Sequence, residues 1–158
     1  MGLKPASWDY AEEFVTEDDI LAAARARAVE VGVAPIGTGC GAALRFLAAV
    51  TEARAVVEIG TGTGVSGLWL LRGMRSDGVL TTVDTEAEHQ RLAKQTFTDA
   101  GIASQRARLI NGAALDVLPR LTDGHYDLVF CDGDKREYSD YLAAVSYTHL
   151  TLPTILRV

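Results

Sequence analysis

Three alternating glycines between a predicted strand and a predicted helix constrain this chain more than any other feature. The apolar run 56–59 predicts a strand and carries one carboxylate, Glu58. Gly60, Gly62 and Gly64 follow, and apolar residues at helical spacing come directly after them. Glycines at such a turn allow a sharp bend and let a ligand approach the backbone closely. Because the first amides of a helix favour an anionic or strongly polar group, the turn is predicted to bind a cofactor.

The spacing of the glycines distinguishes two kinds of cofactor. The dinucleotide fingerprint G-x-G-x-x-G needs its third glycine at position 65, where this chain has Val65. The pattern is instead E-x-G-x-G-x-G, which resembles motif I of the class I methyltransferases that use S-adenosyl-L-methionine (SAM). A second predicted strand, residues 79–83, ends on Asp84, at the position that reaches the ribose hydroxyls in both cofactor families. The spacing therefore favours SAM over a nicotinamide dinucleotide.

Size and composition limit the classes of protein that remain. At 158 residues the chain suits one domain with a buried core. Its net charge of −6 and pI near 5.0 argue against nucleic acid as a partner. Its two cysteines, Cys40 and Cys131, lack the spacing of a disulfide framework or a zinc site. We find no signal-peptide pattern and no apolar run of transmembrane length, so we expect a cytoplasmic protein without a membrane partner.

Strand and helix patterns alternate along the chain, which is typical of a parallel sheet covered on both faces. The core elements predicted are strands 56–59, 79–83, 107–110 and 126–131 and helices 65–74, 86–100 and 115–122. Before them we expect one helix that begins with Thr16 as its cap and runs to about Gly32, and another after the glycine-rich loop 36–41. The expected fold is a doubly wound α/β sheet of order 3-2-1-4, with Gly60 and Asp132 at the same edge.

Several motifs, in this order, make the chain resemble the family 3 O-methyltransferases, the group that contains catechol and caffeoyl-CoA O-methyltransferases. The matching segments are residues 58–66, Asp84, residues 112–113 and residues 126–135. The resemblance covers roughly residues 8–145 and implies a Rossmann-like methyltransferase fold. It also implies SAM-dependent methyl transfer to a hydroxyl of a small acceptor, catechol-like or phenolic, assisted by a divalent cation such as Mg²⁺.

The same resemblance implies roles for individual residues. Positions at the methionine end of the cofactor match Ile36, Glu58, Gly60, Thr61, Gly62 and Ser66. Asp84 would hold the ribose, Thr85 and Ala113 would lie beside the adenine, and Asp134 would also lie beside the cofactor. Asp132 matches a cofactor-binding, metal-binding and catalytic aspartate, and Lys135 matches the catalytic lysine. A cation lowers the pKa of a coordinated hydroxyl, and a lysine whose pKa is depressed can remove its proton.

The C-terminal residues depart from this family. Residues 146–158 match none of its motifs, and they break the helical pattern that begins at Tyr138. We interpret residues 1–145 as a partial methyltransferase domain and residues 146–158 as a non-family tail that arises from a sequence artefact, with a divergent tail as the alternative. The sheet would then lack its last strands. Asp132 would be left as the one metal ligand, and a single carboxylate holds a divalent cation poorly.

Other interpretations stay open. The same glycine turn would serve a non-catalytic SAM-binding fragment, and a nicotinamide-dependent oxidoreductase is the less favoured alternative because of Val65. Lys135 stands in a predicted surface loop, where lysines are usually just solvated. The histidines share no ligand spacing and are interpreted as structural or exposed; they are His89, His125 and His149.

An aromatic N-terminal arm contains Trp8, Tyr10 and Phe14. These side chains would either line the acceptor pocket or pack the arm on the domain or on a second subunit. The last alternative leaves a homodimer open.

Overall fold

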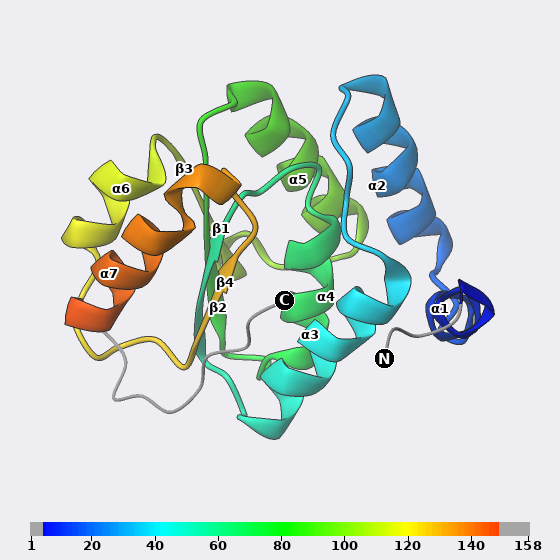
Figure 1. Ribbon diagram of the computed structural model, residues 1–158, viewed down its shortest axis with the longest axis horizontal. Helices are drawn as coiled ribbons and strands as arrows, with labels where there is room; N and C mark the ends of the chain where they lie inside the picture. The colour runs from blue at the N-terminus through cyan, green and yellow to red at the C-terminus, as the bar shows by residue number, and fades with distance from the viewer. Residues whose placement is uncertain (1–4, 149–158) are drawn as a thin grey trace.

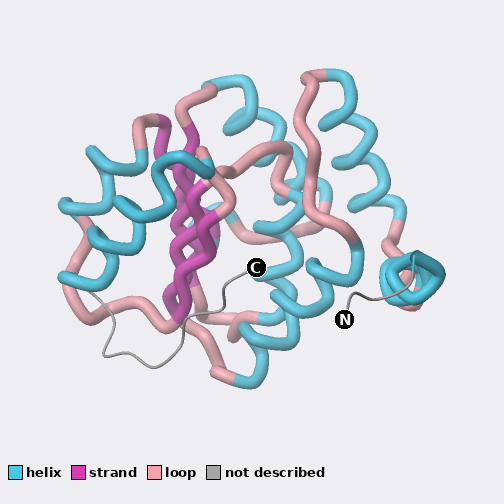
Figure 2. The backbone as a smooth tube through the Cα atoms, viewed as in Figure 1, coloured by secondary structure: helices cyan, strands magenta, loops and turns pink. Residues whose placement is uncertain are grey.

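A four-stranded parallel sheet forms the centre of the computed structural model, which describes residues 5–148. The strands are β1 (Ala55–Ile59), β2 (Val79–Asp84), β3 (Ala107–Asn111) and β4 (Leu128–Cys131). Their order is β3-β2-β1-β4, which confirms the predicted 3-2-1-4 arrangement. The strands lie side by side in Figure 2, and β1 pairs with both β2 and β4. The strand order therefore reverses between β1 and β4, where ligands bind in sheets of this type.

Helices cover both faces of the sheet (Figure 1). They are α1 (Pro5–Glu13), α2 (Asp19–Glu30), α3 (Thr38–Val50), α4 (Val65–Gly73), α5 (Ala87–Asp99), α6 (Ala114–Val117) and α7 (Tyr138–Thr148). Side chains of β1 alternate between two hydrophobic clusters, as the pleat of a strand requires. Val56 packs with α2, α3, α4 and α5, whereas Val57 packs with α6 and α7. This double burial is typical of parallel sheets.

The N-terminal part differs from the prediction in two ways. Asp18, not Thr16, caps α2, because its carboxylate accepts a hydrogen bond of 3.0 Å from the Leu21 amide. The aromatic arm forms α1 as far as Glu13, so that Phe14 follows the helix; α1 has no buried residue and packs on α3. The contact is polar: the Glu12 carboxylate accepts a 2.9 Å hydrogen bond from the Gly39 amide. Because this contact caps the start of α3, part of the predicted loop 36–41 is helical.

The predicted helix 115–122 is also wrong in detail, because the chain forms the short α6 and then a 3₁₀ turn, η2 (Leu118–Arg120). Pro119 has no amide hydrogen, so it cannot donate to the carbonyl four residues earlier and continue α6. Two other 3₁₀ turns, η1 (Ser104–Arg106) and η3 (Lys135–Glu137), precede β3 and α7.

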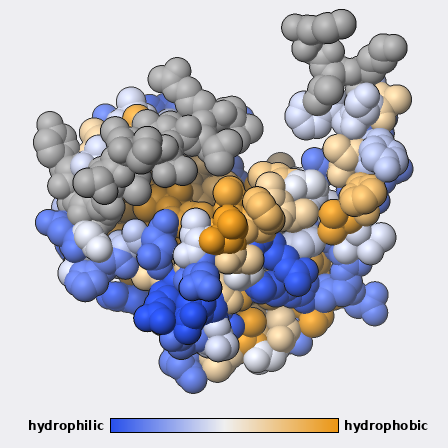
Figure 3. All heavy atoms as spheres, turned by 90° about the horizontal axis from the view of Figure 1, so that it is seen from below, coloured by the Kyte–Doolittle hydropathy of each residue, from blue (hydrophilic) through white to orange (hydrophobic). Residues whose placement is uncertain are grey.

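The C-terminal helix α7 continues through Thr148, past the break expected at Ser146. The rest of the expected tail, residues 149–158, lies outside the described residues. Within residues 5–148, β4 pairs with β1 alone and forms one edge of the sheet. No helix in this part of the chain is long and apolar enough to cross a membrane. The face at the amino ends of the strands, seen in Figure 3, mixes hydrophobic and hydrophilic residues.

Because α3 and α4 are in close contact, one methyl group added between them should destabilise the protein. A Cβ at Gly73 would lie 2.2 Å from the carbonyl oxygen of Arg45, which belongs to the backbone and cannot rotate away. We expect Gly73→Ala to lower the free energy of unfolding by about 1–3 kcal/mol, the usual cost of overpacking. The measurement is urea denaturation followed by circular dichroism.

Gly112→Ala is the matched control, since its Cβ would meet only the Val117 side chain at an ordinary 3.4 Å. A Gly73→Ala protein as stable as this control would contradict the close packing of α3 on α4.

Candidate functional site

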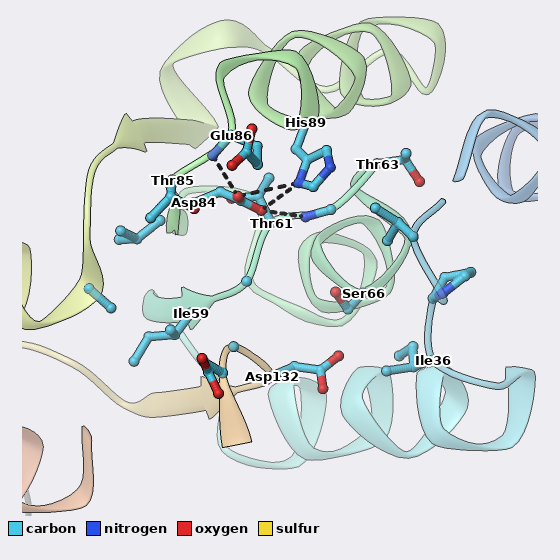
Figure 4. A pocket seen from close by; sticks show the side chains of 18 of the residues that line it. Ile36, Ile59, Thr61, Thr63, Ser66, Asp84, Thr85, Glu86, His89 and Asp132 are labelled. Atoms are coloured by element: carbon cyan, nitrogen blue, oxygen red, sulfur yellow. Dashed lines mark hydrogen bonds and ion pairs between the residues drawn. The ribbon is translucent and has the colours of Figure 1, made fainter. Parts of the chain in front are cut away.

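A cavity of about 420 Å³ opens at the carboxyl ends of β1, β2 and β4 (Figure 4). It is lined by the loop before α3, the glycine turn after β1, the segments after β2 and β3, and the segment from Asp132 to Tyr141. Gly60 and Asp132 lie at the same edge, as predicted. A Cβ on Gly60 would stand 2.5 Å from the carbonyl oxygen of Asp132. The glycine therefore allows the ends of β1 and β4 to meet.

The glycine turn has a backbone that other residues rarely adopt. Gly60, Gly62 and Gly64 have φ angles of 95°, 49° and 85°. Gly64 is the N-cap of α4, and no side chain forms a capping hydrogen bond there. The first amides of α4 are thus available to an anionic group of a ligand.

Asp84 is fixed by three donors at the end of β2. Its carboxylate accepts hydrogen bonds from the Gly62 amide at 3.0 Å and the Glu86 amide at 2.9 Å. Nδ1 of His89 lies 3.3 Å from both carboxylate oxygens. Dashed lines mark these contacts in Figure 4. The side chain of Asp84 is 11% exposed and lines the cavity. The three donors hold its carboxylate in one orientation there.

His89 was missed as a site residue by the sequence analysis, because spacing was compared only among the histidines. It lines the cavity through its contact with Asp84. The missed signal is its position five residues after the acidic strand end, in the first turn of α5. His125 is exposed, as expected, and His149 lies outside the described residues.

Glu58 is buried completely and does not line the cavity. Its two oxygens accept hydrogen bonds from the hydroxyls of Ser66, at 2.5 Å, and Thr82, at 2.6 Å. Burial raises the pKa of Glu58 to about 7, although the two hydroxyl hydrogen bonds lower it, and the charges of Asp132 and Asp84 raise it further. Ser66 does line the cavity and therefore stands between Glu58 and a ligand.

The acidic segment after β4 is more open. Asp132 and Asp134 both line the cavity. Desolvation raises the pKa of Asp132, and the charge of Lys135 opposes this effect. Asp134 is bound by Arg136 at 2.5 Å, and this contact lowers the pKa of Asp134 to about 2. Lys135 itself is exposed and lies outside the lining of the cavity.

Residues 5–148 contain no group of three or more His, Cys, Asp or Glu side chains that could hold a metal ion. The predicted metal ligand Asp132 is one carboxylate, and one carboxylate does not hold a divalent cation well by itself.

Most of the other residues that were predicted to bind the cofactor border this cavity. Those that line the cavity are Ile36, Gly60, Thr61, Gly62, Ser66, Asp84, Thr85 and Ala113. Glu137 and Tyr141 are among the other lining residues that sequence reasoning missed. The Tyr141 hydroxyl donates to Glu137 at 2.7 Å, and burial together with this bond raises the pKa of Tyr141 to about 12. None of the arm residues Trp8, Tyr10 and Phe14 lines the cavity.

The sheet order, the glycine turn and the acidic end of β2 together define a Rossmann-like domain with a nucleoside-type cofactor cavity. The model of the O-methyltransferase family matches residues 12–147, and the chain belongs to this family.

Similar proteins agree with this assignment. The chain is 58% identical over 133 residues to a protein from Mycobacterium sp. (strain JLS) that is named as an O-methyltransferase; the match covers 84% of this chain and 60% of that protein. An O-methyltransferase-named protein of Mycobacterium tuberculosis (strain ATCC 25177 / H37Ra) is 54% identical over 136 residues, which are 86% of this chain and 61% of the relative. The chain thus spans about 60% of the length of the curated relatives it matches.

Solved structures share the fold. The O-methyltransferase TomG from Streptomyces achromogenes, crystallised in complex with SAM, superposes with a TM-score of 0.82 at 27% identity. The match covers 94% of this chain and 71% of that chain. A cofactor-bound protein from MTB also gives a TM-score of 0.82, at 32% identity over 95% of this chain and 70% of its own.

The burial of Glu58 predicts a pH-dependent stability. The pKa of Glu58 is raised from 4.5 to about 7, so the folded protein holds this proton more tightly than the unfolded chain. The resulting stabilisation is fully present below pH 4.5 and is lost as the pH rises through about 7. Relative to Glu58→Gln, the wild type should lose up to about 3 kcal/mol of unfolding free energy across this interval.

Urea denaturation of both proteins from about pH 4 to about pH 8 measures this difference, with the exposed Glu30→Gln as the control. A constant difference between wild type and Glu58→Gln would contradict the burial of an ionisable Glu58.

Proposed function

We propose that this chain carries the cofactor site of an O-methyltransferase that moves the methyl group of SAM to a hydroxyl of a small acceptor. The observation that carries the proposal is the charge of the cavity. Five of the residues that line it are acidic and none is lysine or arginine; the acids are Asp84, Glu86, Asp132, Asp134 and Glu137. Such a cavity attracts the sulfonium and ammonium charges of SAM, whereas it repels the phosphates of a nicotinamide dinucleotide.

The geometry supports a specific orientation of the cofactor. The ribose hydroxyls would donate to Asp84, whose carboxylate is already oriented by Gly62 and Glu86. Thr85 and Ala113 would contact the adenine, and the methionine end would extend past Gly60 toward Ser66 and Ile36. The cavity volume of about 420 Å³ is within the range of small-molecule sites. TomG, which shares the fold, was crystallised in complex with SAM, and this supports SAM as the cofactor.

Methyl transfer from a sulfonium is an in-line displacement, so the protein mainly has to orient the acceptor and the cofactor. The acceptor oxygen forms a bond to the methyl carbon while the bond from that carbon to sulfur breaks, and the hydroxyl proton passes to a base. We assign this base role to Lys135, next to the carboxylate of Asp132. A catechol-like or phenolic acceptor stays a prediction, as do the homodimer and the cytoplasmic location.

A divalent cation such as Mg²⁺ receives no step in this mechanism, because the described residues contain no group of three or more His, Cys, Asp or Glu side chains that could hold it. A non-catalytic SAM-binding fragment remains the second candidate for the 158-residue chain, because Lys135 does not line the cavity.

Cofactor binding should depend on Asp84 and not on Lys135. Asp84→Ala removes two charge-assisted hydrogen bonds to the ribose, so SAM affinity should fall at least about tenfold. Lys135→Ala should change it by less than about twofold, because the exposed side chain lies outside the cavity. Isothermal titration calorimetry with SAM measures both variants, and titration with NAD tests the choice of cofactor. Equal SAM affinity in wild type and Asp84→Ala would show that the nucleoside binds elsewhere.

We expect metal-dependent activity only from a protein that also contains the segment by which the relatives are longer. We propose that a chimera, with residues 146–158 replaced by the continuation of the Mycobacterium sp. (strain JLS) protein, methylates a catechol in the presence of Mg²⁺. A chelator should abolish the activity and Asp132→Asn should remove most of it, whereas the 158-residue chain should be inactive. Radiolabelled methyl transfer measures all four samples. Mg²⁺-stimulated activity of the 158-residue chain would contradict the assignment of residues 146–158 as a non-family tail.

A further inference from the structure

A chain of buried hydrogen bonds, called the relay below, connects α5, the glycine turn and the strands β2 and β1 beneath the cavity. The Gln90 amide donates to Oγ1 of Thr61 at 2.9 Å, and Oγ1 of Thr61 lies 2.7 Å from Oγ1 of Thr82. Thr82 in turn donates to Oε2 of Glu58 at 2.6 Å. These four residues are at most 8% exposed. Glu58 and Thr82 are direct partners in the β1–β2 register.

The direction of every bond in this relay is fixed from one end. The Gln90 amide nitrogen also lies 3.2 Å from the carbonyl oxygen of Ile110, which can only accept. The amide must therefore present its NH₂ group, and Thr61 accepts from it. Each hydroxyl has one proton, so Thr61 donates to Thr82 and Thr82 donates to Glu58. The relay ends on Oε2 and leaves only Oε1 of Glu58 free to interact with Ser66.

Ser66 is the link between this relay and the cavity. Its hydroxyl donates its single proton to Oε1 of Glu58 at 2.5 Å. The side chain lines the cavity and therefore offers a ligand only the lone pairs of Oγ. The nearby first amides of α4 offer donors instead. The two neighbouring groups thus have opposite hydrogen-bonding character.

We propose that the relay Gln90–Thr61–Thr82–Glu58 sets Ser66 as an acceptor for the amino group of the cofactor, while the start of α4 takes its carboxylate. This inference rests on the proposed SAM site. Glu58, Thr82 and Gln90 are positioning residues, because none of them lines the cavity and all act through Ser66. The relay explains why a completely buried carboxylate accompanies a cofactor turn without reaching the ligand.

The Glu58→Gln variant tests directly whether Ser66 acts as an acceptor toward the ligand. The proton of Thr82 holds the carbonyl oxygen of the new amide on its side, so the NH₂ group must face Ser66. Ser66 then turns its own proton toward the cavity and meets the ligand ammonium as a donor. The readout is the ratio of the affinities for S-adenosyl-L-homocysteine and for its analogue without the amino group, measured by calorimetry.

At about pH 8, where Glu58 with its pKa of about 7 is mostly ionised, we expect this ratio in the wild type to be at least about ten, the usual size of one hydrogen bond to a charged group. Glu58→Gln should reduce the ratio to about one, and Thr82→Val should reduce it several-fold because Glu58 loses the donor that fixes it. Thr82→Ser keeps the hydroxyl and should restore the wild-type ratio. Thr81→Val is the matched control, since Thr81 is buried on the same strand and faces the opposite side of the sheet. A merely structural role would weaken both ligands equally and leave the ratio unchanged.

The outcomes separate the two proposals. A wild type that binds the nucleoside without preferring the amino group contradicts the relay and leaves the SAM site standing. An unchanged ratio in both Glu58→Gln and Thr82→Val also contradicts the relay. The decarboxylated analogue gives a further test. If Glu58→Gln loses the preference for the cofactor carboxylate instead of the preference for the amino group, the relay is also contradicted, because Ser66 would then donate to the carboxylate in the wild type. A wild type that binds none of these ligands contradicts both the relay and the proposed function.

Discussion

The burial of one carboxylate at the centre of the sheet governs the structure around the cavity. Glu58 has no exposed surface, so water cannot solvate its charge, and each oxygen needs a protein donor. Thr82 and Ser66 supply these donors from β2 and α4. Each of these elements also carries part of the cavity wall, so satisfying the buried acid and building the site require the same positions. A shift of either element would leave a charge unpaired in the core, which is far more costly than the loss of an apolar contact.

A second constraint is steric and acts through the backbone. The ends of β1 and β4 approach so closely at Gly60 that a Cβ would overlap the carbonyl of Asp132. This approach closes the base of the cavity and brings Asp132 and Asp84 to opposite sides of one space. The charges of these two residues therefore favour a cation or a strong hydrogen-bond donor in the space between them. We therefore expect the charge of the cavity to favour positively charged ligands, in addition to any individual contact.

The sequence could predict those parts of the site that follow from local pattern and from the parallel arrangement of strands. The glycine turn, Asp84 and Asp132 each follow a strand, so their position at one edge follows directly from the topology. Thr82 and Gln90 could not be found in this way, because their roles depend on which atoms the register and the α5 docking bring together. The cap of α2 was mispredicted because several residues in a row can cap, and the three-dimensional path chooses Asp18. The packing of α1 on α3 includes a hydrogen bond between Glu12 and Gly39, residues that no sequence period connects.

That same contact gives the N-terminal helix a mechanical connection to the cavity. The loop that carries Ile36 into the cavity wall is held at one side by the end of α2, where the Val33 amide donates to the carbonyl of Ala28. At its other side, the Glu12 carboxylate holds the Gly39 amide from outside the domain core. The loop is thus a short span between two anchors, one of which belongs to a helix with no buried side chain. Any displacement of α1 must break that hydrogen bond or pull on the wall of the cavity, so the most exposed helix of the described chain is coupled to the space where the cofactor would bind.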